Sequence, residues 1–187
     1  MKLLFVNACV REGSRTRRLA EYLLAKFDVD VKEVNLAKMN LLPMNEGFLK
    51  KRFEYIARKD FSDQMFDLAK DFASADVIVV AAPYWDMSFS SLLKVYIEHV
   101  NVSKIVFDFS TKGEMVKLCK AEKLYYVTTE GGFGPDDFGF GYVKGLCEKL
   151  YGIRDVKMIK AMGLDIKGSD VEAILNKAKQ EIDEMMR

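Results

Sequence analysis

Two aromatic residues and a carboxylate occupy one short loop, where they could hold a flat ligand. The unbroken apolar run Val77 to Ala82 predicts a strand buried on both faces, as in a parallel sheet. The residues after it lie at the carboxyl end of that strand, where open α/β sheets bind ligands. The alternative is a strand end whose aromatic residues cover the core. The five loop residues are Pro83, Tyr84, Trp85, Asp86 and Met87.

A phosphate site is indicated after the first predicted strand. Ser14 is a good N-cap for the amphipathic helix that follows, and Ser14, Arg15 and Thr16 lie in its first turn. A helix N-terminus offers unpaired N–H groups and about half a positive charge, which bind phosphate. Arg11 or Arg15 would add a countercharge. The dinucleotide fingerprint GxGxxG is absent, which favours a mononucleotide phosphate. An ordinary capped helix with basic surface residues is the alternative.

A glycine loop follows the fourth predicted strand, in the order Thr129, Glu130, Gly131, Gly132. Paired glycines let the backbone approach a ligand closely and direct N–H groups at it. A flexible connection between strand and helix is the alternative. The three loops follow strands one, three and four, whose carboxyl ends share one rim of a parallel sheet. Together they predict a pocket for flavin mononucleotide, FMN.

Strand and helix patterns alternate along the chain and predict a doubly wound α/β domain, because parallel strands need crossover helices. Strands are expected at 2–7, 31–36, 77–82, 123–129 and 156–161. Helices are expected at about 14–26, 49–56, 61–72, 90–100 and 138–150, and after the start signal at 168–170. Residues 37–46 are predicted to form a loop. Residues 101–122 are predicted to form an excursion that projects from the sheet.

Composition excludes several classes of function. The 187 residues fit one domain over 1–187, and a formal net charge of +1 without a basic stripe argues against nucleic acid as a partner. No run approaches the roughly 20 apolar residues of a membrane span, so we expect a cytoplasmic protein without membrane contact. The single His99 and three scattered cysteines predict no metal site and no disulfide framework. Chemistry must therefore come mostly from a bound cofactor.

The sequence resembles the FMN-dependent NAD(P)H azoreductase and quinone oxidoreductase family nearly end to end. The triplet 14–16 resembles its Ser-x-Ser/Thr phosphate loop, and residues 75–100 resemble its strand, Pro-containing flavin loop and Leu-Lys helix. Residues 129–132 resemble its second flavin loop, and 150–153 its Gly-Ile connection into the last strand. The resemblance implies a three-layer flavodoxin-like domain with a five-stranded parallel sheet and helices on both faces. It also implies a homodimer.

The resemblance assigns site residues. The loop at 84–87 would line the isoalloxazine near N5 and O4, and 129–132 would meet its N1/O2 edge. The excursion would cover the partner's flavin, making Phe109 a wall of the substrate pocket. Asp86 stands where azoreductases usually carry Asn. The residues implied to bind the cofactor are Ser14, Arg15, Thr16, Pro83, Tyr84, Trp85, Asp86, Met87, Thr129, Glu130, Gly131 and Gly132.

Glu130 is a second departure, because it adds a carboxylate to the loop that meets the negative charge of reduced flavin. Two orientations are open at this stage. In one the carboxylate faces the flavin and lowers its potential; in the other it points to solvent and only the glycine backbone touches the cofactor.

The predicted function is an FMN-dependent oxidoreductase that passes two electrons from NADH or NADPH to quinone, azo or nitroaromatic acceptors by a ping-pong mechanism. The flavin N5 would be the reacting atom, so no catalytic side chain and no metal are predicted. One alternative is a flavodoxin-type FMN electron carrier without its own nicotinamide site. A sensor or scaffold without turnover is another. The excursion at 101–122 favours the enzyme.

Overall fold

A five-stranded parallel sheet organises the protein, and the computed structural model describes residues 1–187. The strand order is β2–β1–β3–β6–β7, and every neighbouring pair is parallel. The predicted strands and their parallel arrangement are therefore confirmed. The strands are β1 (Leu3–Asn7), β2 (Val31–Asn35), β3 (Val77–Ala81), β6 (Lys123–Thr129) and β7 (Asp155–Ala161).

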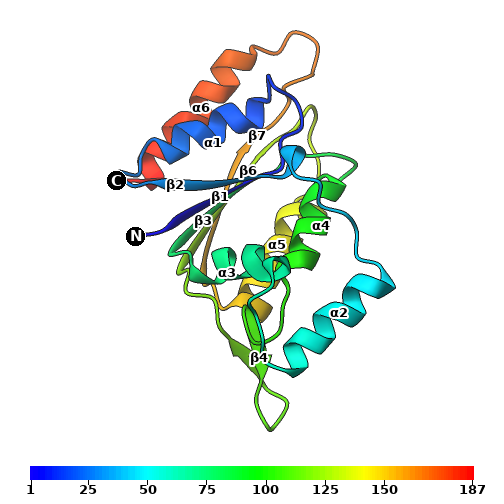
Figure 1. Ribbon diagram of the computed structural model, residues 1–187. Coiled ribbons are helices and arrows are strands. Elements are labelled where there is room, and N and C mark those ends of the chain that lie inside the picture. Colours follow the sequence, from blue (N-terminus) through cyan, green and yellow to red (C-terminus); the bar gives the residue numbers. More distant parts are fainter.

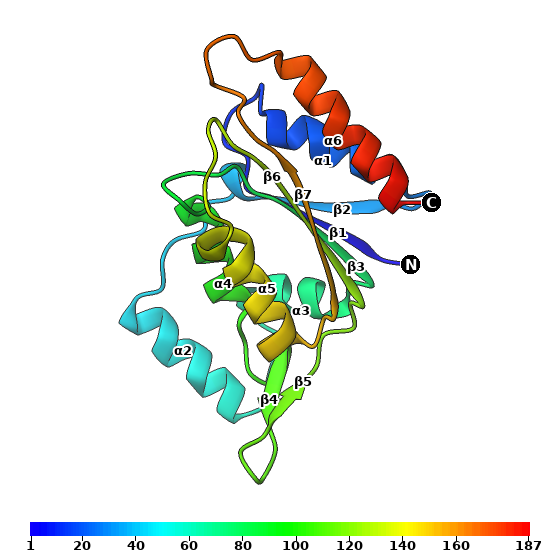
Figure 2. The ribbon, with the colours of Figure 1, turned by 180° about the vertical axis from the view of Figure 1, so that it is seen from behind.

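Helices cover both faces of this sheet, which gives three layers (Figures 1 and 2). Successive residues of a strand point to opposite faces, and β1 shows this directly. Leu3 and Phe5 pack in the core with α1 and α6, whereas Leu4 and Val6 pack in the core with α3, α4 and α5. The helices are α1 (Arg15–Leu24), α3 (Asp67–Ser74), α4 (Ser91–Val100), α5 (Tyr142–Leu146) and α6 (Val171–Met185).

Shorter helical turns complete the layers. Single 3₁₀ turns occur at Leu36–Lys38 and Gln64–Phe66, and π-helical segments at Asp137–Gly141 and Cys147–Tyr151 flank α5. The helix predicted at 138–150 is therefore present, but much of it is wound as π-helix. Such segments occur often at functional sites, and the first of them follows the glycine loop. No helix combines the length and the apolar character that crossing a membrane requires.

Helix α2 (Glu46–Ala57) stands outside the layer that contains α3 and α4 (Figure 1). The buried Arg52 docks it by donating to the carbonyl oxygens of Glu98, at 3.1 Å, and Asn101, at the end of α4. His99 Nε2 lies 2.9 Å from the carbonyl oxygen of Leu42. These contacts fix the loop before α2 against the back of α4.

The segment at 101–122 forms a separate antiparallel hairpin rather than a helix. Its strands are β4 (Phe107–Phe109) and β5 (Met115–Lys117), which pair with each other and not with the main sheet. The hairpin projects beyond the end of the sheet where β6 begins, at the bottom of Figure 1. It therefore lies at the opposite end from the rim that the three special loops share.

Candidate cofactor site

A pocket opens at the carboxyl ends of β1, β3 and β6. Its volume is about 380 Å³, within the range of small-molecule sites. The chain leaves β1 toward α1 on one face and leaves β3 toward α4 on the other. This reversal is the switch point at which open α/β sheets bind ligands. The lining residues are Val10, Arg11, Gly13, Ser14, Arg15, Thr16, Pro83, Tyr84, Trp85, Thr129, Glu130, Gly131, Leu164 and Asp165.

The N-terminus of α1 forms one wall of the pocket. Ser14 is its N-cap, and the hydroxyl oxygen accepts the Arg17 N–H at 3.2 Å. This bond uses the oxygen as an acceptor and leaves the hydroxyl hydrogen to donate to an anion. The first N–H groups of the helix have no partner within the helix. The predicted cap is confirmed, and the pocket wall has the donors that a phosphate needs.

Arg15 and Arg11 place two positive charges at this wall. Arg15 Nη1 lies 2.7 Å from Oδ1 of Asp165 and donates to the Leu164 carbonyl at 3.3 Å. Arg11 also lines the pocket and forms no ion pair. Arg11 therefore carries an unpaired positive charge at this wall, whereas the charge of Arg15 is shared with Asp165. Both side chains are exposed enough for water to screen them.

Thr16 joins the N-terminus of α1 to the glycine loop. Its side chain is fully buried, and its hydroxyl oxygen lies 2.6 Å from that of Thr129 at the end of β6. Either hydroxyl can be the donor, so one of the two hydrogens stays free for a further acceptor. The pair thus ties α1 to β6 and holds the two loops at a fixed separation.

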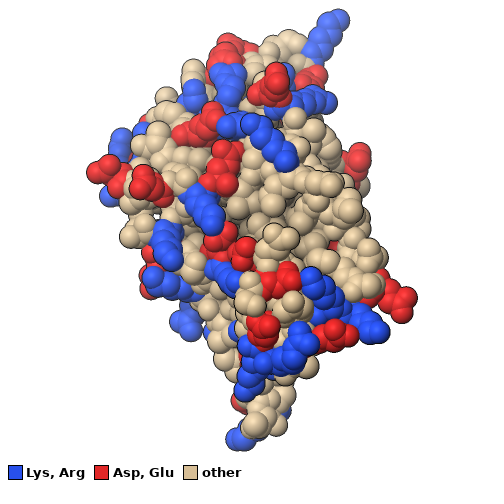
Figure 3. Space-filling view, in the orientation of Figure 1, with Lys and Arg blue, Asp and Glu red and all other residues tan.

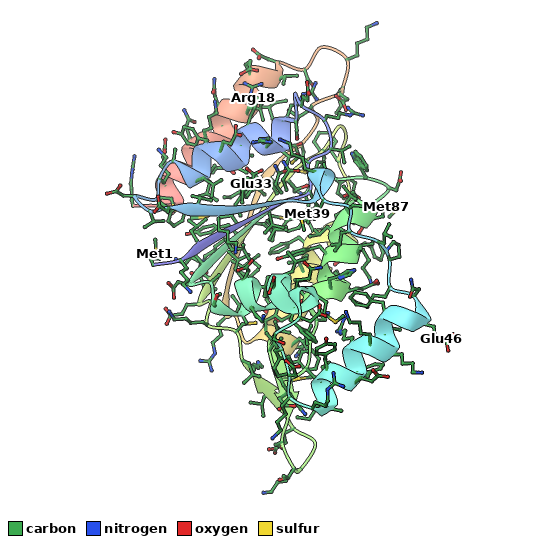
Figure 4. All side chains as sticks on the ribbon, in the orientation of Figure 1. Met1, Arg18, Glu33, Met39, Glu46 and Met87 are labelled. Atoms are coloured by element: carbon green, nitrogen blue, oxygen red, sulfur yellow. The ribbon has the colours of Figure 1, made fainter.

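The aromatic loop turns back sharply after Trp85. Trp85 and Ser88 exchange backbone hydrogen bonds of 3.0 and 2.8 Å, and the φ angles of Asp86 and Met87 are +49° and +67°. Two consecutive positive φ angles are typical of a type I′ turn. Pro83, Tyr84 and Trp85 consequently line the pocket, whereas Asp86 and Met87 form the tip of the turn and do not. Figure 4 shows Met87 at the outer edge of the molecule.

The glycine loop runs beside the segment that follows β7. The carbonyl oxygens of Glu130, Gly131 and Gly132 accept from Leu164, Asp165 and Gly163, at 3.1, 2.9 and 2.9 Å respectively. A Cβ on residue 131 would lie 2.4 Å from a carboxylate oxygen of Asp165. A residue with a Cβ at 131 would therefore require the exposed Asp165 side chain to move. Gly131 lines the pocket, whereas Gly132 has no heavy atom near its missing Cβ and lies outside the lining.

The structure excludes one of the two expected orientations of Glu130. Only 2% of the residue is exposed, so the solvent-facing orientation is wrong. Oε2 accepts the N–H of Gly134 at 2.9 Å, and Oε1 lies 3.5 Å from Nζ of Lys160. The carboxylate therefore sits behind the glycine loop, in contact with the backbone of that loop and with a lysine of β7.

The chain matches known proteins over almost its whole length. The Flavodoxin_2 family model, described as a flavodoxin-like fold, matches residues 1–186. An FMN-dependent NADH:quinone oxidoreductase of Coprothermobacter proteolyticus is 31% identical over 199 residues, covering 100% of this chain and 98% of that protein. The chain belongs to this flavodoxin-like oxidoreductase family. The predicted family and fold are thereby confirmed.

Solved structures share the fold. An azoreductase from Bacillus anthracis str. Sterne has a TM-score of 0.84 at 21% identity, covering 100% of this chain and 98% of that one. An FMN-dependent NADH-azoreductase from Bacillus anthracis str. Ames Ancestor, solved in complex with FMN, has a TM-score of 0.80 at 19% identity. That match covers 99% of this chain and 97% of the azoreductase.

Two residues of the pocket come from a loop that the sequence did not single out. Leu164 and Asp165 follow β7, the fifth strand, whose carboxyl end reaches the same rim. Gly163 and Gly168 both have positive φ angles and flank this loop. Two glycines and a carboxylate after the last parallel strand were the signal that could have identified it.

Phe109 does not reach the pocket of its own chain. It lies on β4, is exposed, and packs edge-on against Phe107 with ring centroids 5.9 Å apart. The hairpin lies at the end of the sheet opposite the carboxyl ends of β1, β3 and β6 (Figure 2), and the residues that line the pocket follow those carboxyl ends. Phe109 can therefore contact a bound cofactor only if it belongs to the neighbouring subunit of a dimer. Its role in the substrate pocket stays a prediction.

Proposed function

We propose that the protein binds FMN in the pocket at the carboxyl rim and passes two electrons from NADH to a quinone, azo or nitroaromatic acceptor. The observation that carries the proposal is the convergence of a helix N-terminus, an aromatic wall and a glycine loop on one pocket. The names of the matched family members support the same chemistry. NADPH is a further candidate donor, which is proposed only because the sequence resembles an NAD(P)H-dependent family.

The residues present fit FMN. The buried hydroxyls of Ser14 and Thr16 and the N–H groups of α1 offer donors to a phosphate, with Arg11 as countercharge. One helix N-terminus suits one phosphate, and the loop has no fingerprint for a pyrophosphate. Tyr84 and Trp85 offer flat apolar surfaces to the ring system. FMN is therefore favoured over FAD.

When bound, FMN supplies the two-electron chemistry, and the protein supplies binding, orientation and electrostatics. The α1 terminus fixes the phosphate end, and the hydrogen bond from the Tyr84 N–H to the Thr129 carbonyl, at 3.2 Å, fixes the aromatic loop against the glycine loop. Donor and acceptor would use the same open face in turn. No side chain needs to act as a nucleophile.

A flavodoxin-type electron carrier is the second candidate. It would hold FMN equally well but would lack a place for nicotinamide. Two features favour the enzyme: the hairpin at β4–β5, which is suited to covering a neighbouring site, and the family of NADH-dependent relatives. A carrier would accept electrons from a protein donor and would not oxidise NADH by itself.

We also propose a homodimer. Exposed apolar side chains stand on the loops that follow β3 and β6, namely Trp85, Met87, Phe133 and Phe138. Figure 3 shows an area without charged residues on the right of the view, and Figure 4 places Met87 there. A surface of this kind is typical of an interface or a ligand site. Burial of this area in a dimer would also narrow the opening of the pocket.

The cofactor assignment predicts that flavin released from the purified protein co-elutes with FMN on chromatography. Turnover with NADH and a quinone should give parallel double-reciprocal lines, because both reactants would use one flavin face. Stoichiometric FAD, or apoprotein that takes up no flavin, contradicts the assignment. Intersecting lines contradict the shared face.

The dimer predicts a selective effect of Phe109→Ala. The KM for the acceptor should rise several-fold, about 1 kcal/mol of lost aromatic contact, while the FMN dissociation constant stays unchanged. Val116→Ala is the matched control. Val116 is also exposed and lies on the facing strand, but it pairs with Asp108 rather than with Phe109, so it belongs to the other face of the hairpin. If both variants change the KM equally, the cross-subunit role is refuted. It is also refuted if sedimentation shows a monomer under conditions in which the enzyme turns over fully.

A further inference from the structure

The Glu130 carboxylate closes the glycine loop on itself. It accepts the N–H of Gly134, four residues later, at 2.9 Å. Residues 130–134 therefore form a ring in which Gly131 faces the pocket and the side chain of Glu130 lies behind it. Gly134 is half-buried, and an N–H shielded from water loses free energy when its acceptor is removed, so this bond restrains the loop beside the pocket.

Lys160 and Asp136 complete a group of three charges. Lys160 Nζ lies 2.6 Å from Oδ1 of Asp136 and 3.5 Å from Oε1 of Glu130. Although burial lowers the pKa of Lys160, the hydrogen bond with Asp136 and the charge of Glu130 raise it above its ordinary value, so the ammonium stays charged. Two carboxylates and one ammonium sum to a charge of −1. Because one ammonium faces two carboxylates, the group keeps a net negative charge beside the glycine loop.

This negative charge reaches the wall of the pocket. Burial, followed by the charge of Glu130, raises the pKa of Tyr84, and Lys160 opposes the shift only in part. Tyr84 lines both the cofactor pocket and a small cavity of about 10 Å³ that Thr128 and Glu130 also line. Tyr84 Oη, Thr128 Oγ1 and Glu130 Oε1 are buried without a hydrogen-bond partner. Few groups thus screen the carboxylate on this side.

We propose that Glu130 is a positioning residue with two separable roles toward FMN: its hydrogen bond to Gly134 holds the glycine loop, and its charge disfavours the reduced cofactor. The proposal rests on the proposed function. Reduction adds negative charge to a flavin, and a nearby carboxylate opposes that addition more in a pocket wall than in water. The two roles differ in what they require, because an amide oxygen can replace the hydrogen-bond acceptor but not the charge.

Two substitutions separate the roles. Glu130→Gln keeps an acceptor for Gly134, so the dissociation constant of oxidised FMN should stay within about threefold of the wild-type value. Because the charge is lost, the affinity for reduced FMN, divided by that for oxidised FMN, should rise about tenfold over the wild-type ratio. This ratio corresponds to a rise of about 30 mV in the two-electron potential. Glu130→Ala should show the same rise and should also weaken oxidised FMN about tenfold, because Gly134 loses its acceptor. Redox titration and FMN binding measure both quantities.

Asp155→Asn is the matched control for charge. Asp155 also pairs with a lysine, Lys123, at 3.1 Å, but it lies at the start of β7, away from the pocket. It should leave the FMN potential unchanged. A potential that does not move in Glu130→Gln, or that moves equally in Asp155→Asn, overturns the charge role.

Amide hydrogen exchange of the apoprotein tests the clamp without any cofactor. Exchange at Gly134 should be at least about tenfold faster in Glu130→Ala than in Glu130→Gln. Equal exchange in the two variants overturns the clamp. Wild-type protein that binds no FMN would instead overturn the proposed function, and with it the charge role, whereas the exchange result would still decide the clamp.

Discussion

Replacing Ser14 and Thr16 together with alanine should weaken FMN binding on the order of 100- to 10,000-fold. Each hydroxyl offers a hydrogen bond to a charged phosphate, worth about 1.5–3 kcal/mol, and each tenfold change in affinity is about 1.4 kcal/mol. Both side chains line the pocket and are buried. Titration of the apoprotein with FMN, followed by flavin fluorescence, measures the change.

Ser14 is also a helix cap, so the variant needs a control for lost capping. Asn45 caps α2 in the same way, with Oδ1 accepting the Phe48 N–H at 2.9 Å, and it does not line the pocket. Asn45→Ala should lower the stability of the protein by about 1 kcal/mol and leave FMN affinity unchanged. If the double variant binds FMN as tightly as Asn45→Ala does, the phosphate does not lie at the α1 N-terminus.

Gly134→Ala should reduce FMN affinity on the order of 10- to 100-fold, because overpacking costs about 1–3 kcal/mol. A Cβ at this position would lie 2.1 Å from Oη and 2.3 Å from Cζ of Tyr84, a ring that lines the pocket. The ring or the loop must therefore move. Both movements disturb the wall that would hold the flavin.

Gly132→Ala is the matched comparison for Gly134→Ala. It lies in the same loop, and nothing is found within 4 Å of its missing Cβ. It should bind FMN within about threefold of the wild type, since it adds no clash. Circular dichroism and thermal unfolding show whether both variants fold. If the two alanine variants have equal FMN affinity, Tyr84 and the loop do not form the wall that we describe.

The sequence predicted those parts of the site that depend on local signals. Ser14 is recognisable as an N-cap because a hydroxyl residue precedes an amphipathic period. The run 77–82 is recognisable as a buried strand because it has no polar residue, and parallel strands place their ends on a common rim. These two facts were enough to predict that the N-terminus of α1 and the aromatic loop lie on the same rim of the sheet.

Other parts depend on contacts that no local pattern encodes. Arg15 and Asp165 are 150 residues apart, and only the return of the chain after β7 makes them an ion pair. The position of Lys160 behind Glu130 depends on the register in which Thr128 pairs with Lys160. The outward turn at 86–87 requires a positive φ at Met87, a conformation for which methionine carries no preference.

The central claim is that the rim pocket holds FMN that accepts electrons directly from NADH. Anaerobic titration of the FMN-loaded protein with NADH tests it most directly, with flavin absorbance as the readout. The account predicts stoichiometric bleaching by NADH and recovery of the absorbance when a quinone is added. Flavin that stays oxidised in excess NADH and NADPH, yet is reduced by dithionite, would contradict it and would identify an electron carrier instead.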